Sequence, residues 1–442
     1  MYKTTHLPNP QHCMSETCTD SVFAREADFY LTRYNAYPRL CSAVAPADLA
    51  IAVILPCINE PDVITSLKSL YECTPPLAGT VEVIVLINAS EGASEDIITQ
   101  NTKTKTDVDA WIAVNKRDWI HTRCAMVHGL ARKHAGAGWA RKLAMDEAVR
   151  RFWAVANPRG VIASFDADAI CSTNYFTEIE QTFADESVSG CSIHFEHRTE
   201  HAEYPAGHLL AIAHYELHLR YLTQAMKWTG APYAFHTVGS SMAVRVRDYI
   251  KIGGMNRRQA GEDFYFLHKI IPRGRFCNLT KATVYPSARQ SDRVPFGTGA
   301  AMRAAAQISD PDFKTYQFGS FEALRVLFAN IDALYNNEDT ESVCRRILSF
   351  EMGEYLIKNE IVKSVAHIKA NCASLQSFRT RFIEWFSAFR LIKYLNWLHS
   401  EKLERKNISE ESKKLLTAIG EDAPEDIYAV LVTYRILDKK EF

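Results

Sequence analysis

The sequence predicts an α/β fold with a mostly parallel central sheet, followed by a C-terminal helical region. Short apolar runs recur between residues 51 and 193 with helix-forming segments between them, a pattern typical of strands that alternate with helices. One run, Val161 to Phe165, stops at Asp166-Ala167-Asp168, so two carboxylates emerge where a buried strand ends. Beyond about Phe313 the apolar residues follow helical spacing.

The predicted boundaries divide the chain into three parts. Residues 1–47 form a polar N-terminal extension with one helical stretch, Ser21 to Tyr34, residues 48–300 form the α/β unit, and residues 301–442 form a helical domain. A chain of 442 residues exceeds one average domain. With 47% hydrophobic residues, it can bury a large core.

A strand-helix-strand unit is expected near the start of the α/β unit. An apolar strand, Ile51 to Leu55, precedes a helix from Val63 to Tyr71 with Asp62 as its cap, and a strand from Val81 to Ile87 follows. Short connections of this kind imply parallel pairing and a right-handed crossover.

Polar residues follow both strands of this unit. Pro56, Asn59 and Glu60 come after the first strand, and Asn88 follows the second. Because parallel strands end at the same edge of a sheet, these side chains could hold a nucleotide base or ribose there. The simpler alternative is that they are turn residues, a role that Asn in particular favours.

Asp166 and Asp168 are the candidates for a metal site. They lie two positions apart, so alternation puts both on one side of the backbone if the extended form persists. Carboxylates that close repel each other, and a divalent cation removes the conflict because hard cations prefer carboxylate oxygens. Such a cation would in turn bind a diphosphate. Helix capping or a turn is the alternative explanation.

A glycine pair suggests a phosphate site. Gly136 and Gly138 precede a helix-forming run that contains Arg141. Free N–H groups at a helix N-terminus attract phosphate, and an arginine one turn into the helix could reach the same anion.

Glu262 and Asp263 begin an apolar helix, as acidic residues often do. Capping explains one of them, but not the pair together with the glycine-rich segments that precede it, at Gly239-Ser240 and Gly253-Gly254. A carboxylate at a helix N-terminus stays ionised and oriented, which suits a general base.

In their order along the chain, these motifs resemble the family 2 glycosyltransferases, which are nucleotide-sugar enzymes of the GT-A fold. The order is strand-Pro-x-x-Asn-Glu, strand-Asn-x-Ser, Gly-x-x-x-Ala-Arg, Asp-x-Asp, Gly-Gly-Met and Gly-Glu-Asp, within residues 48–300. The resemblance implies a GT-A-type Rossmann-like sandwich and a metal-dependent, inverting transferase of the hexosyltransferase type. Such an enzyme moves a sugar from a nucleoside-diphosphate sugar to a hydroxyl acceptor, which is a glycan, a lipid-linked molecule or a small molecule.

Carried over residue by residue, the resemblance assigns roles to this chain. Asp263 matches the catalytic base with Glu262 as its neighbour, and Asp166 and Asp168 match the motif that holds Mn²⁺ or Mg²⁺. The expected substrate-binding residues are Pro56, Asn59, Glu60, Asn88, Arg141, Gly239, Ser240, Arg289 and Arg293.

Two departures from the family pattern limit what carries over. The second strand ends in Asn88, where relatives usually have an aspartate, so the base of the donor stays open. From Lys269 to Ala300 no histidine is present to serve as a third metal ligand. His194 and His197 are the alternatives, although a lone histidine is more often structural.

Arg289 and Arg293 lie in a polar loop from Ser287 to Gly299. Their guanidinium groups could close over a diphosphate as a mobile lid that becomes ordered on binding, and an ordinary surface loop is the alternative. The segment Gln290-x-x-Arg293 also resembles a motif of processive relatives, but Val294 replaces the tryptophan of that motif.

Composition excludes several classes of protein. The 51 basic and 52 acidic residues nearly balance, so nucleic acid is not an expected partner. The 11 cysteines are scattered, as expected for reduced thiols. We find no signal-peptide pattern and no apolar run near the ~18 residues of a membrane span. We therefore expect a cytoplasmic protein, in which an aromatic stripe from Phe382 to Phe389 is core or, as the alternative, a peripheral contact with the inner face of the membrane.

Two other classes of function stay open. A sugar-1-phosphate nucleotidyltransferase would need a glycine-rich loop with Arg and Lys after the first strand, which the segment from Pro56 to Glu60 does not resemble. A non-catalytic nucleotide-sugar-binding protein would not need both the Asp-x-Asp and the Glu-Asp motif.

Overall fold

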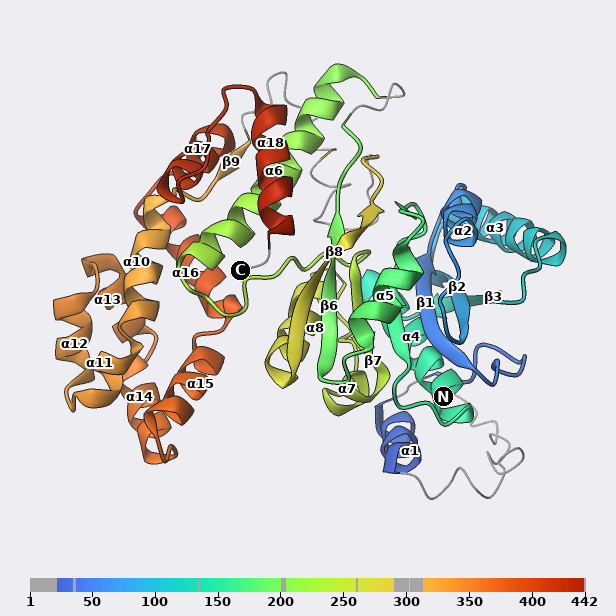
Figure 1. The fold of residues 1–442 in the computed structure, drawn as a ribbon, viewed down its shortest axis with the longest axis horizontal. Coiled ribbons are helices and arrows are strands. Elements are labelled where there is room, and N and C mark those ends of the chain that lie inside the picture. Colours follow the sequence, from blue (N-terminus) through green and yellow to red (C-terminus); the bar gives the residue numbers. More distant parts are fainter. Residues whose placement is uncertain are drawn as a thin grey trace. The chain divides into compact units, whose positions relative to one another are not determined.

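The computed structural model describes residues 22–34, 37–132, 136–199, 204–259, 261–289, 302 and 313–440. The chain forms two compact units, each made of two separate chain segments (Figure 1). Unit 1 comprises Met1–Ile193 and Val238–Val284, and unit 2 comprises His194–Thr237 and Tyr285–Phe442. This division differs from the predicted boundaries at residues 47 and 300.

Unit 1 is built on an eight-stranded sheet. Its strands are β1 (Leu49–Cys57), β2 (Thr80–Ser90), β3 (Ile120–Leu130), β4 (Val161–Ser164), β5 (Ile170–Cys171), β6 (Val188–Phe195), β7 (Met242–Arg245) and β8 (Arg275–Tyr285). Their order is β3-β2-β1-β4-β7-β6-β8-β5. β1 pairs in parallel with β2 and β4, β2 pairs in parallel with β3, and β7 runs antiparallel to β4 and β6. The predicted fold class, a mostly parallel sheet with helices, is confirmed.

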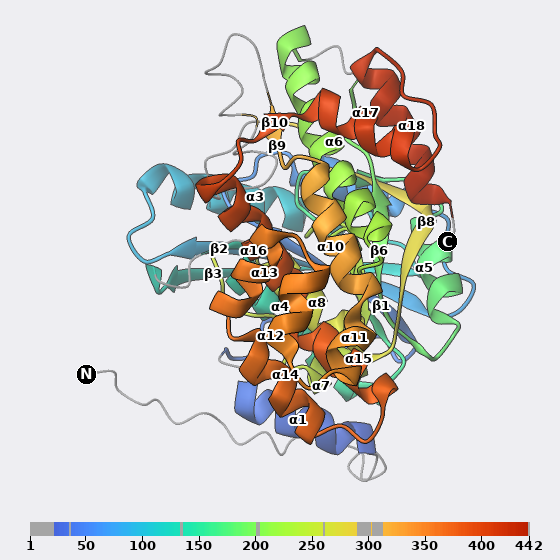
Figure 2. The ribbon, with the colours of Figure 1, turned by 90° about the vertical axis from the view of Figure 1, so that its left-hand side faces the viewer.

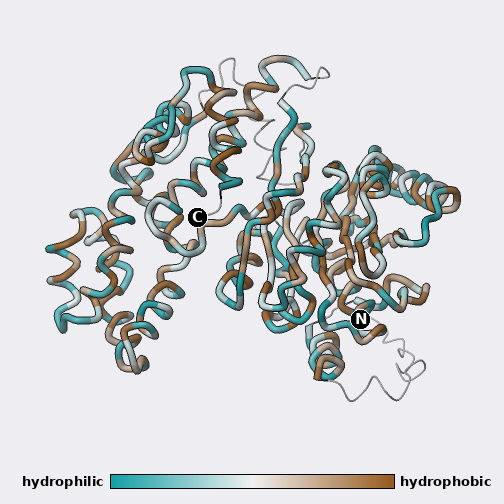
Figure 3. The backbone as a smooth tube through the Cα atoms, viewed as in Figure 1, coloured by the Kyte–Doolittle hydropathy of each residue, from teal (hydrophilic) through white to brown (hydrophobic). Residues whose placement is uncertain are grey.

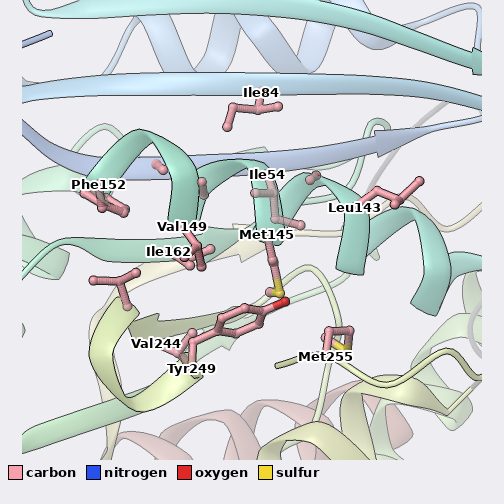
Figure 4. Packing of buried hydrophobic residues seen from close by; sticks show 14 of the residues in the cluster. Ile54, Ile84, Leu143, Met145, Val149, Phe152, Ile162, Val244, Tyr249 and Met255 are labelled. Atoms are coloured by element: carbon pink, nitrogen blue, oxygen red, sulfur yellow. The ribbon is translucent and has the colours of Figure 1, made fainter. Parts of the chain in front are cut away.

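Helices cover both faces of this sheet. They are α1 (Val22–Tyr34), α2 (Val63–Tyr71), α3 (Glu95–Val114), α4 (Ala137–Ala154), α5 (Tyr175–Phe183), α7 (Val246–Lys251) and α8 (Glu262–Ile270), followed by the 3₁₀ turn η2 (Ile271–Arg273). One core lies under α1, α4, α7 and α8, where Ile54 of the sheet packs with Met145 and Phe152 of α4 (Figure 4). The other core lies under α2, α3 and α5 and takes the alternate residues of β1, such as Val53. Burial on both faces explains the continuous apolar runs of the strands.

Helix α1 is part of the first core, although the sequence placed it in an N-terminal extension. Phe23, Ala27 and Tyr30 are buried. The Tyr30 hydroxyl donates to Asp146 Oδ1 of α4 at 2.6 Å, and Lys142 Nζ donates to the same hydroxyl at 3.1 Å. These polar contacts fix α1 against α4, so the segment before residue 48 contributes to the folding of unit 1.

Unit 2 is mostly helical. Its helices are α6 (Ala206–Trp228), α10 (Gly319–Ala329), α11 (Ile331–Asn336), α12 (Thr340–Ile347), α13 (Phe350–Lys358), α14 (Ile361–Ala370), α15 (Leu375–Trp385), α16 (Ala388–Glu401), α17 (Ile408–Ala418) and α18 (Ile427–Lys439). The prediction that everything beyond residue 313 is helical is wrong for two short segments. β9 (Lys314–Thr315) and β10 (Lys406–Asn407) form an antiparallel pair of strands.

Helix α6 belongs to unit 2 because charged side chains bind it to α18, which lies beside it in both views (Figures 1 and 2). Arg220 of α6 is buried and donates to Glu216 on its own helix and to Asp438 on α18. Arg435 of α18 donates to Glu216 Oε1 at 2.7 Å. A helix that the sequence assigned to the α/β unit therefore packs with the C-terminal helices.

The aromatic stripe of α15 and its flank is largely core. Phe382 and Phe386 are fully buried, and Phe389 is 38% exposed. Hydrophilic and hydrophobic stretches alternate along the helices of unit 2 (Figure 3), as expected for helices that each bury one face. In the described part of the chain, no helix is both long and apolar enough to cross a membrane. The nine cysteines described there are free thiols.

Asp438→Ala should destabilise unit 2 by about 3–5 kcal/mol, because it leaves the Arg220 guanidinium buried without one of its two carboxylate partners. Burial alone would raise the pKa of Asp438, but His236 and Arg220 hold it well below its ordinary range. The carboxylate is therefore charged and stabilising at neutral pH, and its contribution is lost only in strong acid.

Urea denaturation at pH 7 measures this loss. The control is Asp426→Ala, which removes an exposed cap that accepts from the Ala429 N–H at 2.8 Å and should cost about 1 kcal/mol. Equal losses for the two variants would contradict the role assigned to Asp438.

Candidate active site

The predicted site residues of unit 1 follow strands that end at one edge of the sheet. Asn59 and Glu60 follow β1, Asn88 lies near the end of β2, and Asp166 follows β4. Both β2 and β4 pair in parallel with β1, so their carboxyl ends share that edge. Open α/β sheets place their ligands at this position.

An asparagine of α3 joins the segments after β1 and β2. Asn101 is buried, its Oδ1 accepts from the Asn59 N–H, and its Nδ2 donates to the Asn88 carbonyl, both at 2.9 Å. Thr104 Oγ1 donates to the Glu60 carbonyl at 2.8 Å. The role of Asn101 cannot be recognised from the sequence, because α3 is polar on most of its surface and gives no signal that one asparagine faces inward.

The predicted nucleotide contacts differ in exposure. The Asn59 side chain is exposed and its backbone adopts φ of +47°, a region that Asn enters more readily than most residues. Glu60 and Asn88 are buried, and Glu60 Oε1 accepts from the Asp62 N–H at 3.2 Å. Of these three side chains, Asn59 is the one exposed to solvent, whereas Glu60 and Asn88 are buried.

The Asp-x-Asp segment is a turn, not an extension of β4. The Ala169 N–H donates to the Asp166 carbonyl at 3.1 Å, so the strand alternation on which the sequence prediction relied ends here. Ala167 and Ala169 are buried, while Asp166 and Asp168 are half-buried. The turn itself therefore leaves both carboxylates partly accessible and both alanines inside.

Arg141 of α4 connects the turn to the start of α8. Its side chain is buried, its Nε donates to Ser164 Oγ at 3.2 Å, and its two terminal nitrogens donate to Asp166 and Glu262. Burial alone would lower the pKa of Arg141, but Asp166, Glu262 and Asp263 hold it above its usual range. One fixed positive charge thus faces three carboxyl groups, which leaves a surplus of negative charge.

Gly239 leaves space for the Arg141 guanidinium because it has no side chain. A Cβ added to Gly239 would lie 2.6 Å from Arg141 Nη2 and 2.7 Å from its Cζ. The next residue, Ser240, is buried, and its Oγ lies 3.3 Å from Ser241 Oγ. Gly239 therefore allows Arg141 to sit between its carboxylate partners.

Glu262 and Asp263 differ in environment although they are neighbours. Glu262 is buried against Arg141, whereas Asp263 is half-buried and its Oδ1 accepts from the Phe264 N–H at 2.8 Å. Burial, followed by the charge of Glu262, raises the pKa of Asp263 to about 7. A carboxyl group with that pKa can accept a proton at neutral pH and later release it.

The two glycines at the start of α4, Gly136 just before the helix and Gly138 in its first turn, are closely packed. A Cβ on Gly138 would lie 2.4 Å from the Arg258 carbonyl oxygen, and a Cβ on Gly136 would lie 2.6 Å from Gln259 Cα. The glycines therefore allow close approach of the segment that leads into α8. This observation gives the pair a structural explanation beside the predicted phosphate contact.

The described residues contain no group of three His, Cys, Asp or Glu side chains that could hold a metal ion. The candidates His194 and His197 are buried in unit 2, where His194 Nε2 lies 2.8 Å from Glu196 and His197 Nδ1 lies 3.0 Å from Glu216. The turn carboxylates nonetheless fit a hard cation. They offer accessible oxygens next to surplus negative charge, and other ligands would come from water or a diphosphate.

The loop with the two predicted arginines is described only at its start. Ser287 Oγ accepts from the Arg289 N–H at 3.3 Å. Arg293 and the rest of the loop lie outside the described residues, so the predicted lid stays a prediction.

No family model matches the chain, and no curated protein matches it. Three solved structures illustrate its similarity in fold. Staphylococcus aureus TarS 1–349 in complex with UDP-GlcNAc is 14% identical, with a TM-score of 0.40, over 78% of this chain and 92% of that one. The Pyrobaculum calidifontis mannosyltransferase PcManGT in complex with GDP-Man and Mn²⁺ is 15% identical, with a TM-score of 0.34, over 96% and 98%.

The third structure is glucosyl-3-phosphoglycerate synthase from Mycobacterium tuberculosis, 17% identical with a TM-score of 0.30, over 61% of this chain and 84% of that one. Identities this low describe fold alone, so the function of this chain rests on the geometry of its own side chains.

Gly239→Ala should displace the Arg141 guanidinium, because two carboxylates prevent that side chain from yielding to the new methyl group. We expect a loss of about 1–3 kcal/mol in the free energy of unfolding. Gly207→Ala is the control, since a Cβ at that exposed helix position meets no atom within 4 Å. Equal changes in stability for the two variants, measured by thermal unfolding, would show that the Arg141 guanidinium can move away from the added methyl group.

Asp263→Asn should make the protein more stable than the parent at pH 8, with the difference shrinking toward pH 4. The folded-state pKa of about 7 lies above the ordinary value. The folded parent therefore holds more protons than the unfolded chain between these pH values, and its stability falls as pH rises through that window. Unfolding curves from pH 4 to pH 8 measure the effect, with Asp118→Asn at an exposed position as control. A constant difference across this range would refute the raised pKa.

Proposed function

We propose that the chain is a metal-dependent, inverting glycosyltransferase of the hexosyltransferase type, which moves a sugar from a nucleoside-diphosphate sugar to a hydroxyl acceptor. The observation that carries the proposal is the position of Arg141, which bonds to Asp166 at the end of β4 and to Glu262 at the start of α8. This arrangement joins a candidate diphosphate site and a candidate base within one unit. A binding protein has no need for that combination.

Displacement at the sugar carbon requires a group that accepts the proton of the attacking hydroxyl. Asp263 suits this role, because it is half-buried and its pKa of about 7 matches neutral conditions. In the proposed step, the acceptor oxygen bonds to the anomeric carbon, Asp263 takes the hydroxyl proton, and the bond from that carbon to the diphosphate breaks. Attack from the face opposite the leaving group inverts the configuration.

Departure of the diphosphate requires neutralisation of its charge. Asp166 and Asp168 would hold Mn²⁺ or Mg²⁺, and a bound cation would supply that neutralisation. Arg141 orients Asp166 by bonding to one of its oxygens and leaves the other available. Because the carboxyl groups outnumber the guanidinium, the site attracts a cation even before the donor binds.

Release of nucleoside diphosphate from candidate donors, with and without acceptor mixtures, tests this proposal. UDP-GlcNAc, GDP-mannose and UDP-glucose are the first donors to try, since the similar structures contain them. Release of pyrophosphate from a nucleoside triphosphate and sugar phosphate would identify a nucleotidyltransferase instead. Binding of a donor without any turnover would identify a binding protein.

Asp168→Asn should abolish turnover and leave the fold intact, and excess chelator should do the same to the parent. Asp263→Asn keeps the shape of the side chain and should reduce the rate about 10²- to 10⁴-fold with little change in donor binding. Full activity in excess chelator would contradict the proposed metal dependence. A product that retains the anomeric configuration would contradict the single-displacement mechanism.

A further inference from the structure

Two cysteine thiols of unit 1 lie in contact just after the Asp-x-Asp turn. Cys73 follows α2, and Cys171 is the second residue of β5, three positions after Asp168. The two sulfur atoms lie 3.6 Å apart and share a hydrogen bond. Cys73 is buried and Cys171 is half-buried, so Cys171 is the member of the pair that keeps contact with solvent.

Hydrogen bonds on either side of the thiol pair hold its two segments in register. Before the pair, Ser66 Oγ of α2 donates to the Ala167 carbonyl, inside the Asp-x-Asp turn, at 2.9 Å. After the pair, the Thr74 N–H donates to the Thr173 carbonyl at 2.7 Å. The two sulfur atoms therefore face each other as part of the fold, and α2 contacts the turn on one side of them.

A disulfide bond between these sulfurs requires only a small movement. Bonded sulfurs lie about 2.05 Å apart, whereas the two thiols are 3.6 Å apart. β5 has two residues and stands last in the strand order of the sheet, so it has one neighbouring strand and can shift more easily than a central strand. The hydrogen bond with Cys73, together with burial, raises the pKa of Cys171. Its thiol is therefore protonated at neutral pH and reacts slowly, because the thiolate is the nucleophile.

We propose that Cys73 and Cys171 are a modification site, at which hydrogen peroxide forms a reversible disulfide that locks α2 to the Asp-x-Asp turn. The Cys171 sulfur, after loss of its proton, attacks one peroxide oxygen, the O–O bond breaks, and a sulfenic acid and one water form. The Cys73 sulfur then attacks the sulfenic sulfur, the S–O bond breaks, and a second water leaves with the thiol proton. The two thiols lose two electrons and two protons, and the peroxide is reduced to two water molecules. A low-molecular-weight thiol reverses the reaction by disulfide exchange.

The disulfide would act on the turn through α2. Ser66 and Cys73 are joined by this helix, so a covalent bond at Cys73 adds to the hydrogen bond that Ser66 makes with Ala167. The Ala169 N–H donates to the Asp166 carbonyl within the turn, and it is released when the turn opens. With β5 tied to α2, opening becomes rarer. This modification goes beyond the proposed transfer reaction and does not depend on it.

Peptide mapping by mass spectrometry tests whether the bond forms. The folded chain is treated with hydrogen peroxide, its remaining thiols are alkylated, and it is digested. We expect two peptides joined through Cys73 and Cys171, lighter by two hydrogens than the separate peptides, and dithiothreitol should separate them. Cys372→Ser removes a half-buried thiol of unit 2 and should leave this bond unchanged, whereas Cys73→Ser should abolish it. Recovery of both cysteines as alkylated thiols, or of Cys171 joined to another cysteine, overturns the proposal.

Amide hydrogen exchange tests whether the bond locks the turn. In the oxidised parent, the Ala169 N–H should exchange at least about tenfold more slowly than in the reduced parent, and dithiothreitol should restore the faster rate. Cys73→Ser, treated with the same peroxide, controls for oxidation elsewhere and should show no slowing. The Ala429 N–H of unit 2, which donates to Asp426, should exchange equally in both forms. Equal or faster exchange of the Ala169 N–H after oxidation overturns the lock. The transferase proposal is tested separately, by donor turnover with the reduced chain.

Discussion

Arg141 carries one positive charge into a site that has three carboxyl groups nearby, and the geometry of that site depends on how the charge is shared. The guanidinium donates to Asp166, Glu262 and the Ser164 hydroxyl oxygen. Asp263 has no such bond, so burial and the charge of Glu262 raise its pKa. One side chain therefore bonds to two of the acids, and the third has a pKa of about 7. The raised pKa of Asp263 lowers the stability of the folded chain at neutral pH, and functional sites often contain groups with such shifted pKa values.

Close packing of backbone supports this arrangement from two directions. Gly239 leaves the space that Arg141 fills, and Gly138 leaves the space in which the segment before α8 lies. Because interiors are densely packed, these glycines fix the position of α4 relative to both the turn after β4 and the candidate base. The precision of the site thus comes from helices and a sheet rather than from the loops that present its side chains.

The sequence predicted local structure well and long-range partners poorly. The bounds of α2 agree with the predicted helix, and β4 stops beside Asp166 as expected, because periodicity and capping are local properties. Asn101 and the partners of Arg141 were not predictable, since each depends on residues brought together only by the fold. The turn at Asp166 and the packing of the α4 glycines show that one short motif can have two structural explanations.

Each unit consists of two separate segments of the chain, and this affects how the chain folds during synthesis on the ribosome. Arg220 and Asp438 are bonded in unit 2 although 218 residues separate them. When α6 leaves the ribosome, its buried acid Glu216 has neither Arg435 nor the rest of α18 beside it. The sheet of unit 1 is completed by the later segment Val238–Val284. During this time α6 has no partner helix. Unit 1 is thus able to fold first, and the nascent chain carries α6 without its partner helix, which a chaperone can recognise until α18 has been synthesised.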